Sequence, residues 1–288
     1  MTTVETVVAR ARGLVTGSLQ HPVTMLSDDW SGGSTITFSP ERKIGPGQQL
    51  CIGLTTFTVL EASAGSATVT PGLDGSTVEN YSAGSVLHIR PLHTTWQIFQ
   101  GLVDAVAELS SPSSGLFRVA SETFSVDQEW GTYQLVERPG RILRVRNRAI
   151  ASDDRWIDVP WNYSADTGIV TVDAVVDRTE LVVEYTLPFT APSSLSDTLA
   201  SLGFTDSQAG LLAVGAARDL PLATEAQRAQ PFSQGDPRRA DEVPITANAM
   251  VHDRLRARFR DLVADERARL VQQYPYVFRY PYVRGGSL

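Results

Sequence analysis

Residues 31–91, SGGSTITFSPERKIGPGQQLCIGLTTFTVLEASAGSATVTPGLDGSTVENYSAGSVLHIRP, decide the fold of the first part of the chain. Apolar and polar residues alternate in the segments STITFS, QLCIGL, TTFTVLEA, SATVTP and GSVLHIRP, which is typical of strands with one buried face. Glycine-rich turns separate these segments, for example at Ala64-Gly65 and Asp74-Gly75. Strands at this spacing predict a small antiparallel barrel or compact sandwich within residues 16–92.

Helices are expected on both sides of this domain. Residues 1–15 carry apolar residues at helical intervals, and Thr2 and Glu5 have the spacing of a capping box. Residues 93–115 are expected to form a linking helix that ends in the segment SSPSSG. Thr94 and Gln97 suit the cap of this helix, which carries one apolar stripe.

A second β-rich region is expected at residues 116–190. Its predicted strands are GTYQLVE, RILRVRNRAI, RWIDVPWNY, GIVTVD and ELVVEYTLPF. Their alternation and the length of the region predict a second antiparallel sandwich.

The next part of the chain, residues 191–244, combines a helix and a loop. The segment SQAGLLAVGAARDL is rich in small residues and predicts a closely packed helix that Asp206 can cap. The following stretch QPFSQGDPRRADEVP holds several prolines and charges, which favours an exposed loop.

Residues 245–273 predict a long helix and residues 274–288 an extended tail. The apolar stripe of the helix comprises Val251, Leu255, Phe259, Leu262, Val263 and Leu270. Pro275 and Pro281 exclude a helical tail. The expected fold class is therefore α+β and mainly antiparallel β, with two small β-barrel or sandwich domains joined by helices, a long C-terminal helix and an extended tail.

The charge of the chain is unevenly distributed. The net charge is −7, and residues 248–288 hold eight arginines and four acidic residues, so that residues 1–247 carry −11. An acidic body argues against a general nucleic-acid binder, because such proteins need a basic surface. No apolar run approaches the roughly 18 residues of a membrane span, and no secretory signal is expected at the N-terminus.

Residues that could carry chemistry do not form a recognisable site in the sequence. The single cysteine, Cys51, excludes an intrachain disulfide and favours a buried core residue. His21, His88, His93 and His252 lack the spacing of metal ligands, and the acid pairs Asp28-Asp29 and Asp153-Asp154 suit solvated turns. We therefore expect no enzymatic activity, no metal and no cofactor.

Arginines are concentrated on the C-terminal helix. Arg254, Arg256, Arg258 and Arg260 alternate, so on a helix they divide between two flanks. Three interpretations remain open. The arginines could pair with acidic residues of their own helix, with an acidic neighbour such as another copy of the chain, or with DNA phosphates. Arg254 and Arg258 are the candidate interface residues of this helix.

The tail repeats the unit Tyr-Pro-Tyr-Val. Its candidate interface residues are Tyr274, Tyr276, Phe278, Arg279, Tyr280 and Arg284. Exposed aromatic and arginine residues are typical of docking surfaces. The alternative is that the tail folds back on its own domain.

Residues 25–91 resemble a recurring domain of neck and connector proteins of tailed double-stranded DNA bacteriophages. The strand Thr68–Pro71, the turn Asp74–Thr77 and the segment Tyr81–Gly84 carry this resemblance. Further along the chain, a W-x-x-vP-x-x-Y element and the segment GAARDLPLATEAQR at 215–228 are also similar to such proteins.

The resemblance implies a structural virion protein of the head-to-tail adaptor or connector family. Such a subunit forms a homo-oligomeric ring, of twelve copies by expectation, and binds the portal protein and neighbouring neck or tail proteins. Genomic DNA would pass through the ring without specific binding, and assembly would take place in the host cytoplasm without a membrane. The alternatives are another tail or baseplate structural subunit, a carbohydrate-binding β-sandwich module, or an enzyme with scattered catalytic residues.

Overall fold

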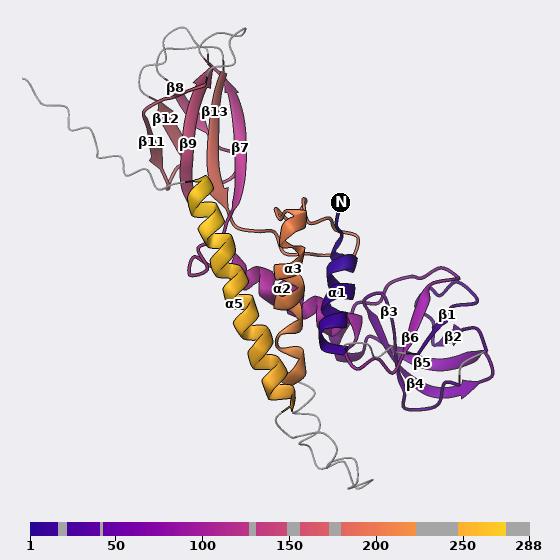
Figure 1. The fold of residues 1–288 in the computed structure, drawn as a ribbon. Helices are drawn as coiled ribbons and strands as arrows, with labels where there is room; N and C mark the ends of the chain where they lie inside the picture. Colours follow the sequence, from indigo (N-terminus) through magenta and orange to yellow (C-terminus); the bar gives the residue numbers. More distant parts are fainter. Residues whose placement is uncertain are drawn as a thin grey trace, which may run out of the picture. The chain divides into compact units, whose positions relative to one another are not determined.

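The computed structural model describes residues 1–16, 22–40, 43–126, 131–148, 156–172, 180–222 and 247–274 (Figure 1). The fold is mixed α+β, with antiparallel strand pairs and a long C-terminal helix, which confirms the class expected from the sequence. The chain divides into two compact units. Unit 1 comprises Met1–Leu109 and Phe189–Leu262, and unit 2 comprises Ser110–Pro188 and Val263–Leu288.

Unit 1 contains a six-stranded sheet whose order is β1-β6-β3-β4-β5-β2. The strands are β1 (Val23–Met25), β2 (Thr35–Thr37), β3 (Gln49–Ile52), β4 (Thr55–Ser63), β5 (Ser66–Pro71) and β6 (Val86–Ile89). An antiparallel bridge between Leu26 and Phe38 joins the two edges of the sheet. Beside it, the Ser39 amide donates to the Met25 carbonyl at 3.0 Å. The sheet therefore curls into a partial barrel.

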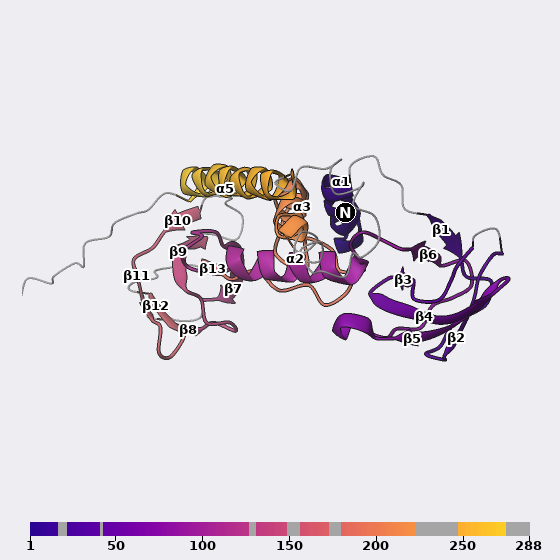
Figure 2. The ribbon, with the colours of Figure 1, turned by 90° about the horizontal axis from the view of Figure 1, so that it is seen from below.

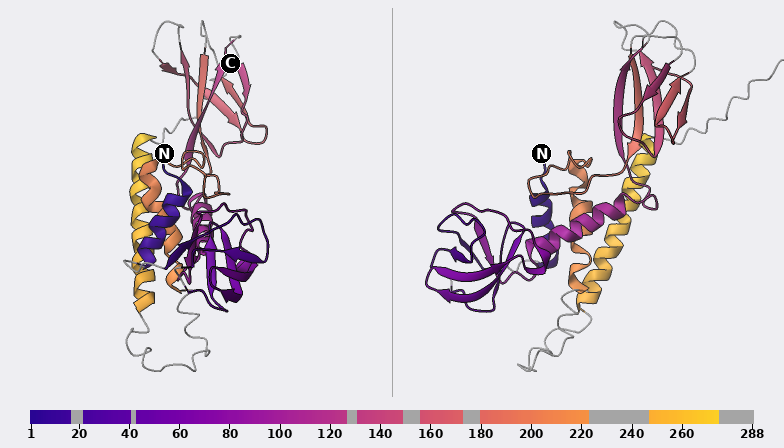
Figure 3. Two further views of the ribbon diagram at one scale, coloured as in Figure 1. Left: turned by 90° about the vertical axis from the view of Figure 1, so that its right-hand side faces the viewer. Right: turned by 180° about the vertical axis from the view of Figure 1, so that it is seen from behind.

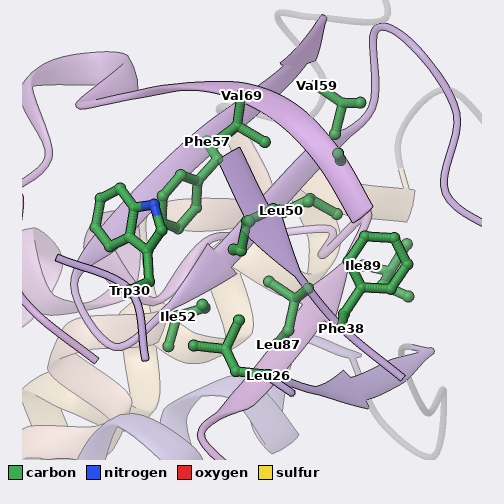
Figure 4. Packing of buried hydrophobic residues seen from close by; sticks show 12 residues of the cluster. Leu26, Trp30, Phe38, Leu50, Ile52, Phe57, Val59, Val69, Leu87 and Ile89 are labelled. Carbon is green, nitrogen blue, oxygen red and sulfur yellow. The ribbon is translucent and has the colours of Figure 1, made fainter. Parts of the chain in front are cut away.

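The inner face of this sheet holds the core of unit 1. Figure 4 shows its buried side chains, which come from alternate positions of the strands as the sequence predicts. The rings of Trp30 and Phe57 meet edge to face with centroids 5.0 Å apart. The indole N–H of Trp30 donates to the Gly33 carbonyl at 2.9 Å, so that the buried tryptophan keeps its hydrogen bond.

The helices α1 (Val4–Thr16), α2 (Thr95–Leu109) and α3 (Ala209–Ala217) pack together in unit 1 (Figure 2). The predicted cap of α2 is confirmed, since the Thr94 amide donates to Gln97 Oε1 at 3.0 Å and the Gln97 amide donates to Thr94 Oγ1 at 3.2 Å. This reciprocal pair satisfies two amides that the first turn of a helix leaves free.

The predicted caps of the other two helices are wrong. At α1, the side chain that accepts an amide is Thr3, which bonds the Thr6 N–H at 3.4 Å. Before α3, the short 3-10 helix η2 (Asp206–Gln208) is capped by a box of Thr205 and Gln208. Asp206 instead accepts the Thr2 amide at 2.9 Å, so its carboxylate ties the N-terminus to this turn.

Small residues allow α2 and α3 to approach closely. A Cβ at Gly101 of α2 would lie only 2.5 Å from the carbonyl oxygen of Ala216 in α3. Helix α3 is buried along nearly its whole length. The small-residue composition predicted close packing, and the contact at Gly101 is its physical basis.

Unit 2 is a sandwich of two antiparallel sheets, shown in Figure 3. Its strands are β7 (Arg118–Ser125), β8 (Gly131–Gln134), β9 (Arg141–Arg148), β10 (Trp156–Asp158), β11 (Trp161–Ser164), β12 (Ile169–Val172) and β13 (Glu180–Leu187). One sheet has the order β10-β9-β13-β7 and the other β11-β12-β8. Val145, Val170, Val172, Leu181 and Val183 are fully buried in the core that these strands form.

Two features of unit 2 differ from the sequence prediction. Strand β7 was not predicted. The segment RWIDVPWNY, predicted as one strand, forms β10 and β11, which belong to different sheets. Pro160 lies between them, and its missing N–H cannot continue a ladder of hydrogen bonds.

Helix α5 (Ala247–Gln273) runs for 27 residues. Of its predicted stripe, Leu255, Phe259 and Leu270 are buried, and Leu262 and Val263 are half-buried. Val251 is 40% exposed, so the prediction that it belongs to the buried stripe is wrong. Its neighbour His252 is buried in its stead, at 6% exposed.

Candidate protein interface

Arg218, just after α3, anchors the first part of α5 within unit 1. Its side chain is only 14% exposed, forms ion pairs with Glu108 and Asp219, and lies 4.5 Å from the ring centroid of Phe259. Burial lowers the pKa of Arg218, but hydrogen bonds to Glu108 and Asp219 outweigh it and the net pKa is raised. The guanidinium is therefore a permanently charged contact for the helix.

His252 forms a second anchor at the same place. Its Nδ1 lies 2.7 Å from the Arg218 carbonyl oxygen and 3.7 Å from Asp219 Oδ1. No sequence signal marks this role, because a histidine beside an apolar stripe belongs to no motif. Together with the buried ring of Phe259, this contact fixes which face of α5 is turned away from unit 1.

The arginines of the first part of α5 lie on the exposed side of the helix, with Arg254 and Arg258 on one flank and Arg256 and Arg260 on the other. Arg254, Arg256, Arg258 and Arg260 are all exposed, and none of them has an ion-pair partner among the described residues. The ion pair that forms within the described part of α5 joins Arg269 to Glu266 at 2.6 Å. The pairing of these four arginines with acids of their own helix, one of the three interpretations, is therefore not observed.

Exposed guanidinium groups of this kind suit a partner that carries carboxylates or phosphates. Arginine presents a planar fork of donors that binds such groups with two parallel hydrogen bonds. The arginine face of α5 is defined here as the exposed side of the helix that carries Arg254 and Arg258 on one flank and Arg256 and Arg260 on the other, and the buried anchors Phe259 and His252 set its orientation.

Of the predicted tail residues, the structure describes Tyr274. It is half-buried at the end of α5, where its ring centroid lies 6.5 Å from that of Phe117. Its amide donates to the Leu270 carbonyl at 2.8 Å. Tyr276, Phe278, Arg279, Tyr280 and Arg284 lie outside the described residues.

Other residues of the types that act in catalysis or metal binding have structural contacts. Cys51 is fully buried, as predicted, and burial raises the pKa of its thiol. His88 Nε2 lies 3.2 Å from Nη1 of Arg12. In the turn before β2, Asp28 accepts the Thr37 hydroxyl and Asp29 accepts the Ala83 amide. His21, Asp153 and Asp154 lie outside the described residues.

Two further findings concern only the part of the chain that the structure describes. No three side chains of the types His, Cys, Asp and Glu come together there as metal ligands could. None of the helices there combines the length and the apolar character that crossing a bilayer demands.

Comparison of the chain with models of known protein families gives no match. Comparison with curated proteins gives no match either. Functional inference for this chain therefore rests on its residues and on the geometry described above.

Proposed function

We propose that the chain is a structural, non-enzymatic virion subunit of a tailed phage, and that it forms part of the neck ring between portal and tail. The observation that carries the proposal is the arginine face of α5, which is exposed and unpaired among the described residues. Residues 1–247 carry a net charge of −11, so such a face is suited to bind an acidic surface of a neighbouring subunit.

Charge of both signs on one chain favours a head-to-tail arrangement of copies. When a basic face of one subunit binds an acidic face of the next, the contact is heterologous, and repeated rotation closes a ring. We infer a ring of about twelve copies, as the resemblance of residues 25–91 to neck proteins implies. Two small β domains joined by helices would supply its loops and contacts to the portal protein and the next tail component.

The acidic balance also suits a channel for DNA. Carboxylates repel the phosphates of a passing duplex, so DNA would move through the ring without binding to it. The arginine face would be used in contacts between protein subunits, where carboxylates neutralise it. The finished ring would reside in the virion.

A charge-reversal variant tests this proposal in particles. Arg258→Glu should lower incorporation of the protein into phage particles at least about tenfold, because a like-charge contact replaces an attractive one. Lys43→Glu is the matched control, since Lys43 is exposed and the charge change is the same. Equal incorporation of both variants would rule out the arginine face as the assembly contact.

Cryo-electron microscopy of the same particles tests the position. A ring of twelve copies next to the portal supports a neck subunit. Density with threefold or sixfold symmetry in the tail or baseplate would assign the chain to the tail instead, and absence from purified particles would overturn the proposal.

A further inference from the structure

Strand β7 of unit 2 is the edge strand of its sheet among the described residues. It is eight residues long and pairs with β13 along its whole length without a bulge. No other described strand pairs with it, since β7 is the last strand of its sheet. Proteins usually protect long edges with lysine, proline, a bulge or a very short strand. The sequence RVASETFS has none of these. Its two inward-facing charged residues are engaged within unit 2, Arg118 by Glu137 and Glu122 by the Tyr185 hydroxyl and the Val136 amide.

The flank of β7 that faces the sandwich is partly apolar. Ala120 and Phe124 pack against the core of unit 2 but remain only partly buried. Glu122, between them, accepts the amide of Val136 at 3.2 Å, which places this valine beside the same flank. Val136 is 88% exposed, more than any other large aliphatic side chain among the described residues of unit 2. An apolar strand added at this edge would cover it.

The tail sequence has the pattern of such a strand. From Tyr276 to Tyr282 it reads YVFRYPY, so aromatic residues occupy the even positions 276, 278, 280 and 282. In a strand, alternate side chains share one face, and alternate backbone groups point to one side. Pro275 and Pro281 are both at odd positions, so both missing N–H groups would point away from the sheet to which the strand adds.

We propose that residues 276–282 of a second copy of the chain add to the open edge of β7 as an antiparallel strand. The N–H groups of the even residues would bond the outer edge of β7 between Arg118 and Phe124. The aromatic side chains of these residues would pack on Ala120, Phe124 and Val136. The odd residues, with both prolines, would form the new outer edge, which proline protects from further addition.

The direction of the chain favours a second copy over the same copy. Tyr274 lies against Phe117, the residue before β7 begins, so the chain leaves α5 beside the start of that strand. A tail that ran from there along its own β7 would be parallel to it. The other pairs of this sheet are antiparallel, and antiparallel pairing is somewhat more stable. A neighbour can supply its tail in the antiparallel direction.

The inference deepens the proposed function, because a ring supplies the neighbour whose tail is exchanged. It can be tested without particles, by measuring the mass of the full-length chain in solution with light scattering. The wild type should self-associate. Phe278→Pro removes an N–H that points toward β7 and should weaken association at least about tenfold. Val277→Pro, at an odd position, is the matched control and should associate like the wild type.

The edge itself is tested by Val136→Asp. Since Val136 is 88% exposed, this variant should fold normally and yet lose association. Leu60→Asp, at a 53% exposed position of unit 1, is its control and should associate normally.

Mixing distinguishes exchange between copies from folding back. The Val136→Asp chain keeps an intact tail, and the Phe278→Pro chain keeps an intact edge. If the tail acts between copies, the two chains should form a species of two chains when mixed, although each alone is monomeric. Mixtures that stay monomeric, a monomeric wild type, or equal loss from Val277→Pro would each overturn the inference.

The outcomes also separate this inference from the proposed function. A chain that enters particles normally with Phe278→Pro, but not with Arg258→Glu, would keep its neck function and refute strand exchange. A chain that exchanges tails in solution but is absent from particles would support strand exchange and refute the neck function.

Discussion

The six-stranded sheet of unit 1 and the four-stranded sheet of unit 2 differ in their edge strands. In unit 1 both edge strands, β1 and β2, are three residues long, and the bridge between Leu26 and Phe38 joins them. In unit 2 the edge strand β7 is eight residues long and has no further strand beside it among the described residues. In unit 1 the two edges therefore bond to each other, whereas in unit 2 the described residues add no strand beyond β7.

This difference indicates separate roles for the two units. A sheet whose edges are bridged and that packs with a helical layer is suited to stability, and a long edge strand is suited to assembly. If the contrast is correct, substitutions that disturb packing in unit 1 should cost much stability. Substitutions at the polar or exposed positions of unit 2 should cost little and should alter association instead.

The largest effect is expected for Phe259→Ala. Phe259 is 2% exposed and lies under the Arg218 guanidinium, and its ring would be 2.8 Å from a Cβ built on Gly215. Removing a buried phenylalanine leaves a cavity and should lower the free energy of unfolding by about 3–5 kcal/mol. Urea denaturation measures this change, and Val251→Ala, at a 40% exposed position, is the control with little effect.

A near-zero change for Phe259→Ala would contradict the packed state of α5. It would mean that the first half of the helix forms only on assembly. Unit 1 would then be less tightly packed than its contrast with unit 2 requires.

A smaller loss is expected for Gly101→Ala. The added Cβ would lie 2.5 Å from the Ala216 carbonyl oxygen, which belongs to backbone and cannot rotate away. Overpacking of this kind costs about 1–3 kcal/mol. At Gly13, in contrast, a Cβ meets nothing within 4 Å, so Gly13→Ala should stabilise α1 by about 0.5–1 kcal/mol. Thermal unfolding of both variants should show shifts of opposite sign.

The sequence predicted the sheet of unit 1 well because its strands repeat a clear physical pattern. Strands β3, β4 and β5 begin at the predicted residues, since apolar alternation and glycine turns mark both ends. Strand β1 was missed because its three residues stand outside any longer alternating run, whereas the equally short β2 lies within the alternating segment STITFS. Strand β7 was missed because its positions toward the sandwich include Arg118 and Glu122, and an edge strand needs few apolar residues.

The candidate interface was only partly predictable. The arginines of α5 follow from the sequence, but their lack of ion pairs among the described residues depends on the rotation of the helix. That rotation is set by His252 and Arg218, which meet through a backbone carbonyl. Contacts to backbone carbonyls leave no mark on residue types, so no pattern could have identified them. The rest of the predicted tail remains a prediction.

In unit 2, Asn147→Val should raise stability. Asn147 is fully buried, and neither the oxygen nor the nitrogen of its side-chain amide has a hydrogen-bond partner among the described residues. Replacing an unsatisfied buried amide by an apolar group should stabilise the unit by about 1–2 kcal/mol. Valine also suits a strand. Asn147→Ala, which leaves a cavity, is the control variant. A loss of stability with Asn147→Val would show that the side-chain amide is hydrogen-bonded and that unit 2 is packed as completely as unit 1.

Of the substitutions expected to remove a stabilising contact, Tyr81→Phe in unit 1 should have the smallest effect at neutral pH. The Tyr81 hydroxyl lies 2.8 Å from Thr55 Oγ1, accepts the Thr55 amide at 3.2 Å, and donates to Glu79 at 3.1 Å. Losing this group should cost about 1 kcal/mol at pH 7.

The pH dependence of the Tyr81→Phe variant distinguishes a buried hydroxyl from an exposed one. Burial, together with the charge of Glu79, raises the pKa of Tyr81 to about 12 in the folded chain, whereas an unfolded tyrosine has a pKa of about 10. Between these values the folded state holds a proton that the unfolded state has released, so wild-type stability falls as pH rises from about 10 to about 12. Phenylalanine cannot titrate, and the advantage of the wild type over the variant should therefore shrink across this range. Denaturation midpoints of both chains at pH 7, 10 and 11 measure the difference. A constant difference would show that Tyr81 is solvated, and that the closed sheet of unit 1 is open to water at this turn.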